Sequence, residues 1–585
     1  MAKFLYPITG ALLIYVILGY FSQIDVKHLG NVEDGHEFVI NKEQGHQIKY
    51  ERFEICQDFN DYSIFHADKY RCYNPIATAF FKNSINTTGW SFLEIETSAK
   101  YDPKVQAYAA GYLEGVLTRR LIEHHIHNVM STYCIGRVDY CRKLREFMDE
   151  NHKWTKEFLA ETDPEDAYYS AIHRTYYQLQ GVIDAFERRP INPRADFEFH
   201  DIVFMNWLGE FYDLSAKFNA TTRVDRVEKC SAMLKLAPDN KDLFFSHVVW
   251  FAFHHMLRVI KLYKFGYDRE KFPGYAVSYT GYPGILNSQD DFQVTSAKLA
   301  IMETTISLYN ASKMEHTKAV GQFPCWIRSI VASQLAWTAK DWVEIFIRHH
   351  MGTYNNHWMI ADYKLFTPGQ PLRDETFYVL ETMPGFWIYK DKSEDLQKNT
   401  YHASYNLPQF PEIIEYSGLE GHAKNFDPAG NGRIGGDYYR SFKAPRARIF
   451  ARDHVKAIDF ESFTKVLRSN DPINEEFAKC ECENGYSVSA AISARGDLGV
   501  ANGTYECYDL GQRNMGALDY KGIDHHRMES MSYRAWGAPP FDDVYPPFEW
   551  KTFEKNSNYR LHHRGHPEKF DFDFVEINWK TNIWD

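Results

Sequence analysis

The sequence predicts an α+β fold, in which a helix-rich first half is followed by strands with helices grouped beside them. Two observations carry this prediction. Between residues 103 and 218, apolar residues recur with the 3.6-residue period of amphipathic helices. After Cys230, short apolar runs are separated by turn residues, as is typical of strands. Because helices and strands do not alternate regularly, layered α+β packing is favoured over βαβ units.

The first half is predicted to be a set of packed helices. One apolar face comprises Val105, Tyr108, Ala109, Tyr112, Leu113, Val116, Leu117 and Leu121. Further helices are predicted around residues 142–159, 165–186 and 204–217. The segment 219–229 is polar and has no clear period, so we interpret it as an exposed linker, where proteolysis concentrates.

The second half contains short apolar runs that we expect to be strands. They lie at 232–236, 243–251, 276–280, 292–295, 359–363 and 377–380. Helices are predicted between them, at 254–264, 324–336 and 342–349. No internal repeat is visible along the chain.

Residues 1–22 are interpreted as a signal peptide, because Lys3 precedes an apolar run over residues 4–20. A membrane anchor is the alternative, since the run approaches the length that spans a bilayer. No later segment is long and apolar enough to span. Four glycosylation sequons agree with a secretory route, and they begin at Asn86, Asn219, Asn310 and Asn502. We therefore expect a soluble body in a secreted or lysosomal protein.

The charge of the chain excludes one class of function. A net charge of -12 provides no basic stripe to neutralise phosphates, so we expect no nucleic-acid partner. The 25 histidines would change this balance in an acidic compartment. Below about pH 6 many of them are expected to gain a proton and bring the surface near neutrality.

Nine cysteines are an odd number for an oxidising lumen, so at least one is expected to be unpaired. A disulfide between Cys134 and Cys141 would close a short loop between two predicted helices. Cys480 and Cys482 are so close in sequence that pairing would be strained, and one of them is expected to reach Cys507 instead. The pairing of Cys56, Cys72 and Cys325 stays open.

Several common catalytic motifs are absent from the sequence. No serine lies in a nucleophile-elbow pattern, and there is no zinc-protease motif, P-loop or paired Cys-x-x-Cys. The nearest approach to metal-ligand spacing is His562, His563 and His566. We predict neither a metal centre nor a cofactor.

Ordered sequence blocks along nearly the whole chain resemble the phospholipase B-like family, also described as the lamina ancestor-like group. The block Cys-Ser-Ala-Met-Leu-Lys at 230–235 carries much of this resemblance. Others are Cys134 with Cys141 and residues 106–111, 117–122, 255–258, 282–284, 303–306, 352–356, 403–406, 445–450, 491–498 and 501–503.

The resemblance implies an N-terminal-nucleophile hydrolase, with a four-layer αββα sandwich and a helical N-terminal portion. It implies a precursor cleaved between Lys229 and Cys230, whose two chains, 23–229 and 230–585, stay associated. The residues agree with this organisation, because a polar linker precedes a cysteine that opens a predicted strand. Small residues, Ser231 and Ala232, follow and leave room around the sulfur.

Cleavage would give Cys230 both a thiol and a free α-amine. An α-amine, with a pKa of about 7.7 to 8, is suited to accept the thiol proton. The resemblance implies that Asn406 stabilises the oxyanion, that Arg446 supplies positive charge and that His247 lies near the site. Each residue also has a structural interpretation. Cys230 and His247 would be core residues, Asn406 would begin a turn and Arg446 would form a salt bridge.

The leading functional hypothesis is a hydrolase that removes acyl chains from glycerophospholipids, as the family name implies. An amidohydrolase of N-acyl amides is the alternative enzyme, and a non-catalytic lipid-binding glycoprotein is the alternative from another class. The last alternative is supported by Val248 and Val249, where the family has Asn or Asp followed by Thr. Lys229 also stands where the family has Ser or His.

Overall fold

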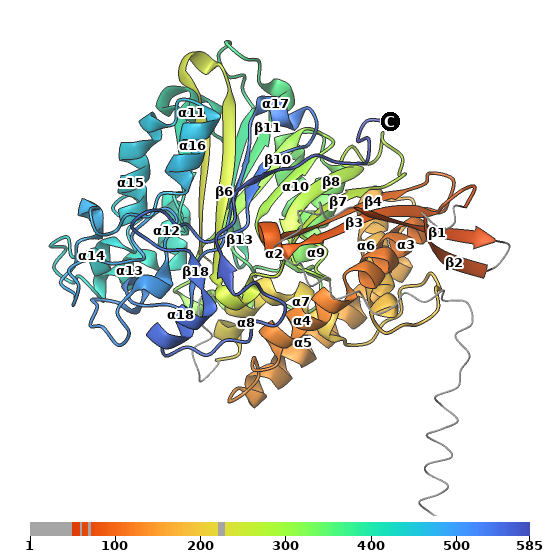
Figure 1. Cartoon of the computed structure of the whole chain (residues 1–585), viewed down its shortest axis with the longest axis horizontal. Helices are drawn as coiled ribbons and strands as arrows, with labels where there is room; N and C mark the ends of the chain where they lie inside the picture. Colours follow the sequence, from red (N-terminus) through yellow and green to blue (C-terminus); the bar gives the residue numbers. More distant parts are fainter. Residues whose placement is uncertain (1–49, 59–60, 68–71, 220–228) are drawn as a thin grey trace, which may run out of the picture.

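The computed structural model describes residues 50–58, 61–67, 72–219 and 229–585 (Figure 1). The predicted signal peptide and linker residues 220–228 lie outside the described residues. The mixture of helices and sheets confirms the predicted α+β class. Within the described parts of the chain, no helix combines the length and the hydropathy that a membrane crossing requires.

The predicted helices of the first half are present, although the first is broken at Thr118 and the last is also broken into two. They are α3 (Pro103–Leu117), α4 (Arg119–Met130), α5 (Val138–Glu161), α6 (Ala167–Phe186), α7 (Asp201–Asn206) and α8 (Phe211–Lys217). Sequence analysis missed four strands that precede them. These are β1 (Glu51–Asp58), β2 (Asp61–His66), β3 (Ala77–Ser84) and β4 (Trp90–Thr97), with the single-turn helix α2 (Ile85–Thr88) before β4.

The larger sheet has eleven strands, in the order β13-β12-β11-β10-β9-β8-β7-β4-β3-β1-β2. The strands that follow the linker are β7 (Arg258–Lys264), β8 (Ala276–Gly281), β9 (Phe292–Thr295), β10 (Leu299–Thr305), β11 (Asn356–Asp362), β12 (Phe377–Met383) and β13 (Phe386–Asp391). Strand β4 pairs in parallel with β7, from Trp90 opposite Arg258 to Glu96 opposite Lys264. One sheet is thus built from both sides of the Lys229–Cys230 bond.

The predicted helix at 254–264 is wrong, because residues 258–264 form strand β7 in the middle of the larger sheet. All seven residues of β7 are buried, so apolar and polar residues do not alternate as they do in a half-exposed strand. Only a short 3-10 turn, Phe253–His255, precedes it.

The smaller sheet has seven strands and contains the predicted nucleophile. Its path is β14 (Tyr401–Ser404), β5 (Lys229–Leu236), β6 (Leu243–Ala252), β16 (Tyr520–Ile523), β17 (Arg534–Trp536) and β20 (Val575–Glu576), and β15 (Met515–Ala517) also pairs with β6. All the pairs in this sheet are antiparallel. A two-stranded ribbon joins β18 (Phe548–Glu549) to β19 (Lys569–Phe570).

The two large sheets pack face to face. One face of β5 and β6 places Leu234 and Phe245 in a core with Leu262 and Met302 of the larger sheet. The opposite face of β5 and β6 packs on helices that include α15 (Pro445–Asp453) and α16 (Phe460–Leu467). Figure 1 shows these helices on one side of β6, with β10 and β11 on the other.

Helices also cover the outer face of the larger sheet. Helices α9 (Cys325–Leu335) and α10 (Ala339–Phe346) pack there, and they match two predicted helices. Helices α3 and α6 pack beside β3 and β4. The remaining helices are α11 (Ser393–Asn399), α12 (Pro411–Ser417), α13 (Leu419–Lys424), α14 (Ile434–Asp437), α17 (His525–Met528) and α18 (Trp550–Asn556).

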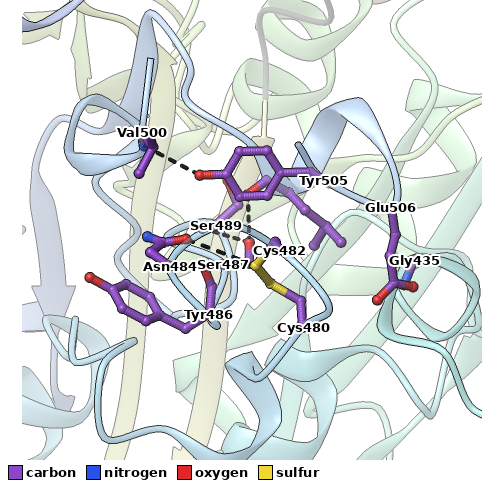
Figure 2. The surroundings of a disulfide bond; sticks show 11 residues. Gly435, Cys480, Cys482, Asn484, Tyr486, Ser487, Ser489, Val500, Tyr505 and Glu506 are labelled. Atoms are coloured by element: carbon purple, nitrogen blue, oxygen red, sulfur yellow. Dashed lines mark hydrogen bonds between the residues drawn. A yellow bond between two sulfur atoms is a disulfide. The ribbon is translucent and has the colours of Figure 1, made fainter. Parts of the chain in front are cut away.

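Three disulfides are present among the described residues. The predicted Cys134–Cys141 bond is confirmed, and Cys56 pairs with Cys72. The expectation that Cys480 or Cys482 reaches Cys507 is wrong, because these two cysteines pair with each other (Figure 2). The turn that follows, closed by the Cys480 N–H donating to the Gly485 carbonyl, holds their Cα atoms 5.3 Å apart. This separation lies within the usual range for a disulfide. Cys230 and Cys325 are buried thiols.

The structure also bears on the predicted glycosylation sites and on the predicted protonation of histidines. All four sequon asparagines are exposed, and their glycosylation stays a prediction. The expected protonation of many histidines below about pH 6 is wrong for a buried group around the 3-10 turn before β7. Burial there lowers the pKa of His125 to about 3 and that of His254 to about 4. These rings therefore add no charge in a mildly acidic compartment.

Two glycines bring α3 and α6 into backbone contact. A Cβ added to Gly181 would lie 2.2 Å from the Tyr108 carbonyl oxygen, and one added to Gly111 would lie 1.9 Å from that of Gln178. Both distances are far below a van der Waals contact. The helices therefore pack at a separation that only glycine permits at these two positions.

We predict that Gly181→Ala destabilises the protein, because the added methyl group must push α3 and α6 apart. The expected loss is about 2 kcal/mol in the free energy of unfolding, measured by denaturant titration. Gly421→Ala is the matched control, because Gly421 lies in α13 with no atom within 4 Å of an added Cβ. Equal stability of the two variants would contradict the packing described above.

Candidate active site

Cys230 lies near the start of β5 and is fully buried. Strand β5 pairs with β6 on one side, where Cys230 is opposite Val249, and with β14 on the other. Cys230 belongs to the same core as Val249 and Phe251, whereas Met233, three positions along the strand and on its other face, packs against the helices. The thiol therefore lies between the two sheets, on a strand that pairs with β6 at Cys230 itself and with β14 from Ala232 onward.

Two predicted site residues hold the main chain of Cys230. Its N–H donates to the Asn406 Oδ1 atom at 2.7 Å, and its carbonyl oxygen accepts from the Arg446 guanidinium. Arg446 also donates to the Asn406 Oδ1 atom at 2.9 Å and to the Tyr405 carbonyl at 2.7 Å. The structure thus brings Cys230, Asn406 and Arg446 together, although Cys230 and Arg446 are 216 residues apart in the sequence.

The backbone of Asn406 adopts a left-handed conformation, with φ of +67°. Asparagine tolerates this region better than most residues do. Its side-chain amide donates to the Thr305 carbonyl at 2.9 Å, and its main-chain N–H donates to the Thr304 hydroxyl at 3.0 Å. These bonds direct the amide oxygen at Cys230. Asn406 thus follows β14 in a turn, as the structural interpretation expected, and also contacts the predicted nucleophile.

Arg446 lies in the first turn of α15 and is 5 % exposed. Its guanidinium stacks on the Trp250 ring, 4.4 Å from the ring centroid. Within the described part of the chain, no ion pair joins it to a carboxylate. The salt-bridge interpretation is therefore replaced by hydrogen bonds to the main chain around Cys230. The positive charge of Arg446 stays available to an anion that forms there.

A carboxylate that sequence analysis missed faces the sulfur. The Cys230 thiol donates to the Asp291 Oδ2 atom at 3.8 Å, and the Tyr354 hydroxyl donates to the Asp291 Oδ1 atom at 2.8 Å. Burial raises the pKa of Asp291 to about 6. Burial, with the negative charges of Asp291 and Glu303, raises the pKa of the Cys230 thiol well above its usual value. The thiol is therefore protonated in the uncut chain.

The sequence carried one signal for Asp291. The pair Asp290–Asp291 directly precedes the apolar run of β9, and two adjacent carboxylates beside a buried strand are unusual unless they have partners. Asp290 has such a partner in Arg258, which also contacts Asp519. Nothing in the sequence indicates the tyrosine at 354 as a partner of Asp291.

His247 lies on β6, on the same side of the sheet as Cys230. A ring nitrogen of His247, the Cys230 sulfur and an Asp291 oxygen all lie within 4.8 Å of one another. Burial lowers the pKa of His247 well below its usual value, so the ring is neutral. A hydrogen bond with the Glu303 backbone opposes this lowering of the pKa but does not outweigh it.

The two valines at 248 and 249 differ in their relation to the thiol. Val249 lies opposite Cys230 and shares its core, whereas Val248 belongs to the core between the smaller sheet and the helices. Of the two valines, only Val249 therefore places an apolar side chain beside the Cys230 thiol. Its N–H donates to the Asp519 carboxylate at 3.0 Å, so the main chain of this position is still bound by a polar group.

A small hollow opens beside Asn406 and Arg446. Its walls are rich in tyrosine and come from the end of β10, from the segment that follows β14 and from the chain that leads into and begins α15. The lining residues are Thr305, Ser307, Tyr309, Tyr405, Asn406, Leu407, Tyr438, Tyr439, Ala444, Pro445 and Arg446. A substrate carbonyl in this hollow would lie next to the two side chains that hold the Cys230 main chain.

We predict that Asn406→Gly lowers the self-cleavage and acyl release expected of Cys230 by about 100-fold, because it removes the amide that binds the Cys230 nitrogen. Glycine keeps the left-handed backbone, so strain does not confound the result. Asn240→Gly is the matched control, because Asn240 has φ of +53° in the turn between β5 and β6. A fall of less than about threefold relative to this control would show that the amide has no chemical role.

Comparison with known proteins identifies the family to which the chain belongs. A family model described as Phospholipase B matches residues 77–577. Phospholipase B-like 2 of Caenorhabditis elegans is 46% identical over 521 residues, covering 88% of this chain and 87% of the relative. Phospholipase B-like 3 of the same organism is 36% identical over 97% of this chain and 98% of its own length. Phospholipase B-like 2 of Homo sapiens is 35% identical over 86% of each chain. The chain therefore belongs to the phospholipase B family.

Proposed function

We propose that this protein hydrolyses acyl ester bonds of glycerophospholipids, with Cys230 as a nucleophile that cleavage of the Lys229–Cys230 bond exposes. One observation carries the proposal. The nitrogen of Cys230 is held by Asn406 at 2.7 Å while its sulfur faces a carboxylate at 3.8 Å. A structural cysteine in a core needs neither arrangement. The stacked sheets with helices outside them support an N-terminal-nucleophile αββα sandwich.

After cleavage, the new α-amine would accept the thiol proton, since its ordinary pKa lies near 8. The thiolate then attacks the acyl carbonyl and forms a tetrahedral oxyanion. An amide nitrogen carries two N–H groups, and one of those on Asn406 is occupied by Thr305. The other, with the Arg446 guanidinium, would stabilise the oxyanion. Water finally hydrolyses the thioester and restores the thiol.

The cleaved chains are expected to stay associated in a secretory or lysosomal lumen. Strand β4 precedes the cut and pairs with β7, which follows it, so separation would break the middle of the larger sheet. The disulfides support an oxidising compartment. The leader and the exposed sequon asparagines support the same route.

An N-acyl amide is the second candidate substrate. The hollow is small, and the Asn406 amide and the Arg446 guanidinium border it. These groups can bind the carbonyl oxygen of an amide as well as that of an ester. A thiolate can attack the carbonyl of an ester or of an amide, so only a direct comparison of the two substrates distinguishes the two candidate functions.

We predict that the purified full-length protein shows two fragments on a denaturing gel and that Cys230→Ala shows one uncut band. Cys325→Ala is the matched control, because Cys325 is another buried thiol and lies in α9. Acyl release from phospholipids and from N-acyl amides, measured side by side, is expected to fall about 1000-fold or more in Cys230→Ala.

Unchanged cleavage in Cys230→Ala would refute the nucleophile assignment. Cleavage without acyl release from either substrate would favour the non-catalytic lipid-binding glycoprotein. Faster release from the amide than from the phospholipid would make the protein an amidohydrolase.

A further inference from the structure

We infer that Asp291 is the base that takes the thiol proton of Cys230 when the uncut chain cleaves itself. This inference rests on the proposed function, since it concerns the step that exposes the nucleophile. Asp291 would accept the thiol proton in the uncut chain, whereas the α-amine can accept it only after cleavage. Before cleavage, the nitrogen of Cys230 is an amide, which has no basic lone pair and donates its hydrogen to Asn406.

The position of Asp291 suits proton transfer. It lies directly before β9, with φ of +59°, so its backbone is held in a left-handed conformation that directs the side chain between the sheets. The Tyr354 hydroxyl donates to the Oδ1 atom at 2.8 Å, the thiol faces the Oδ2 atom at 3.8 Å, and Glu303 forms a further side-chain hydrogen bond with Asp291. A single carboxylate thus has one oxygen fixed and the other facing the sulfur.

The groups around Asp291 come from four strands and from the segment before β11. They are Cys230 on β5, His247 on β6, Glu303 on β10, Tyr354 before β11 and Lys521 on β16. Lys521 is fully buried, and its ammonium donates to Asp519 and to the Asp290 carbonyl. It contributes positive charge but has no lone pair for a proton while it is charged. His247 is a weak base, because burial lowers its pKa well below its usual value.

The proposed step is balanced without an oxidant or a metal. The thiol proton passes to the Asp291 Oδ2 atom as the sulfur bonds to the carbonyl carbon of Lys229. The carbon–nitrogen bond then breaks, and the proton returns from Asp291 to the leaving nitrogen, which becomes the α-amine of Cys230. Water hydrolyses the resulting thioester, giving the Lys229 carboxylate and the free thiol.

The proposed mechanism requires the rate of cleavage to rise with pH. Only the carboxylate form of Asp291 accepts a proton, and burial raises its pKa to about 6. The cleavage rate should therefore rise about tenfold per pH unit below pH ~6 and become level above it. Removing the hydroxyl that stabilises the carboxylate, by Tyr354→Phe, should raise the pKa of Asp291 and move the midpoint to higher pH.

The test follows cleavage of the full-length chain as it is made. The chain is pulse-labelled during synthesis and chased at a series of pH values, and the uncut fraction is measured on a denaturing gel. We expect Asp291→Asn to slow cleavage about 100-fold or more. We expect Tyr354→Phe to shift the midpoint upward. A purely structural role would lower the rate equally at every pH without moving the midpoint.

Cleavage of Asp291→Asn at the wild-type rate would overturn the inference. The proposed function would survive that result if Cys230→Ala stays uncut. Cleavage of Cys230→Ala would refute the proposed function itself. If Asp291→Asn does not fold, the test is the dependence of cleavage rate on pH in Tyr354→Phe. A midpoint at the same pH as in the wild-type chain would overturn the inference.

Discussion

The candidate site depends on the pairing of β5 with strands on both of its edges. This pairing fixes the Cys230 main chain, so that Asn406 binds its nitrogen and Arg446 binds its carbonyl oxygen. The two side chains also bind each other, and any shift of β5 would break all these bonds together. The same register gives the sulfur its position between the sheets. The chemistry that we propose is therefore a consequence of strand register more than of any flexible loop.

Burial sets the second condition for the site. Because the thiol lies away from water, its pKa is raised, and a neighbouring group must take the proton before the sulfur can attack. The carboxylate of Asp291 is placed for this in the uncut chain, and the α-amine would share the task after cleavage. His247 and Val249 complete the surroundings with a neutral ring and an apolar side chain. The site excludes water while it keeps internal proton acceptors.

Sequence analysis predicted the residues that lie in contiguous blocks and missed those that depend on long-range register. Cys230, Asn406 and Arg446 were predicted by the resemblance, and the structure brings them together. Asp291 and Tyr354 contact each other only because β9, β10 and β11 are neighbours in the larger sheet. Strand β7 was mistaken for a helix because both of its faces are buried. The Cys480–Cys482 bond was missed because sequence spacing does not show the turn that joins the two residues.

The central claim is that cleavage makes Cys230 an N-terminal residue. The most direct measurement is the intact mass of the C-terminal chain, taken from the purified wild-type protein after reduction and removal of glycans. We expect a mass that corresponds to a chain beginning at Cys230. A C-terminal chain that begins elsewhere, for instance within residues 220–228, would leave Cys230 without a free α-amine and would contradict the account.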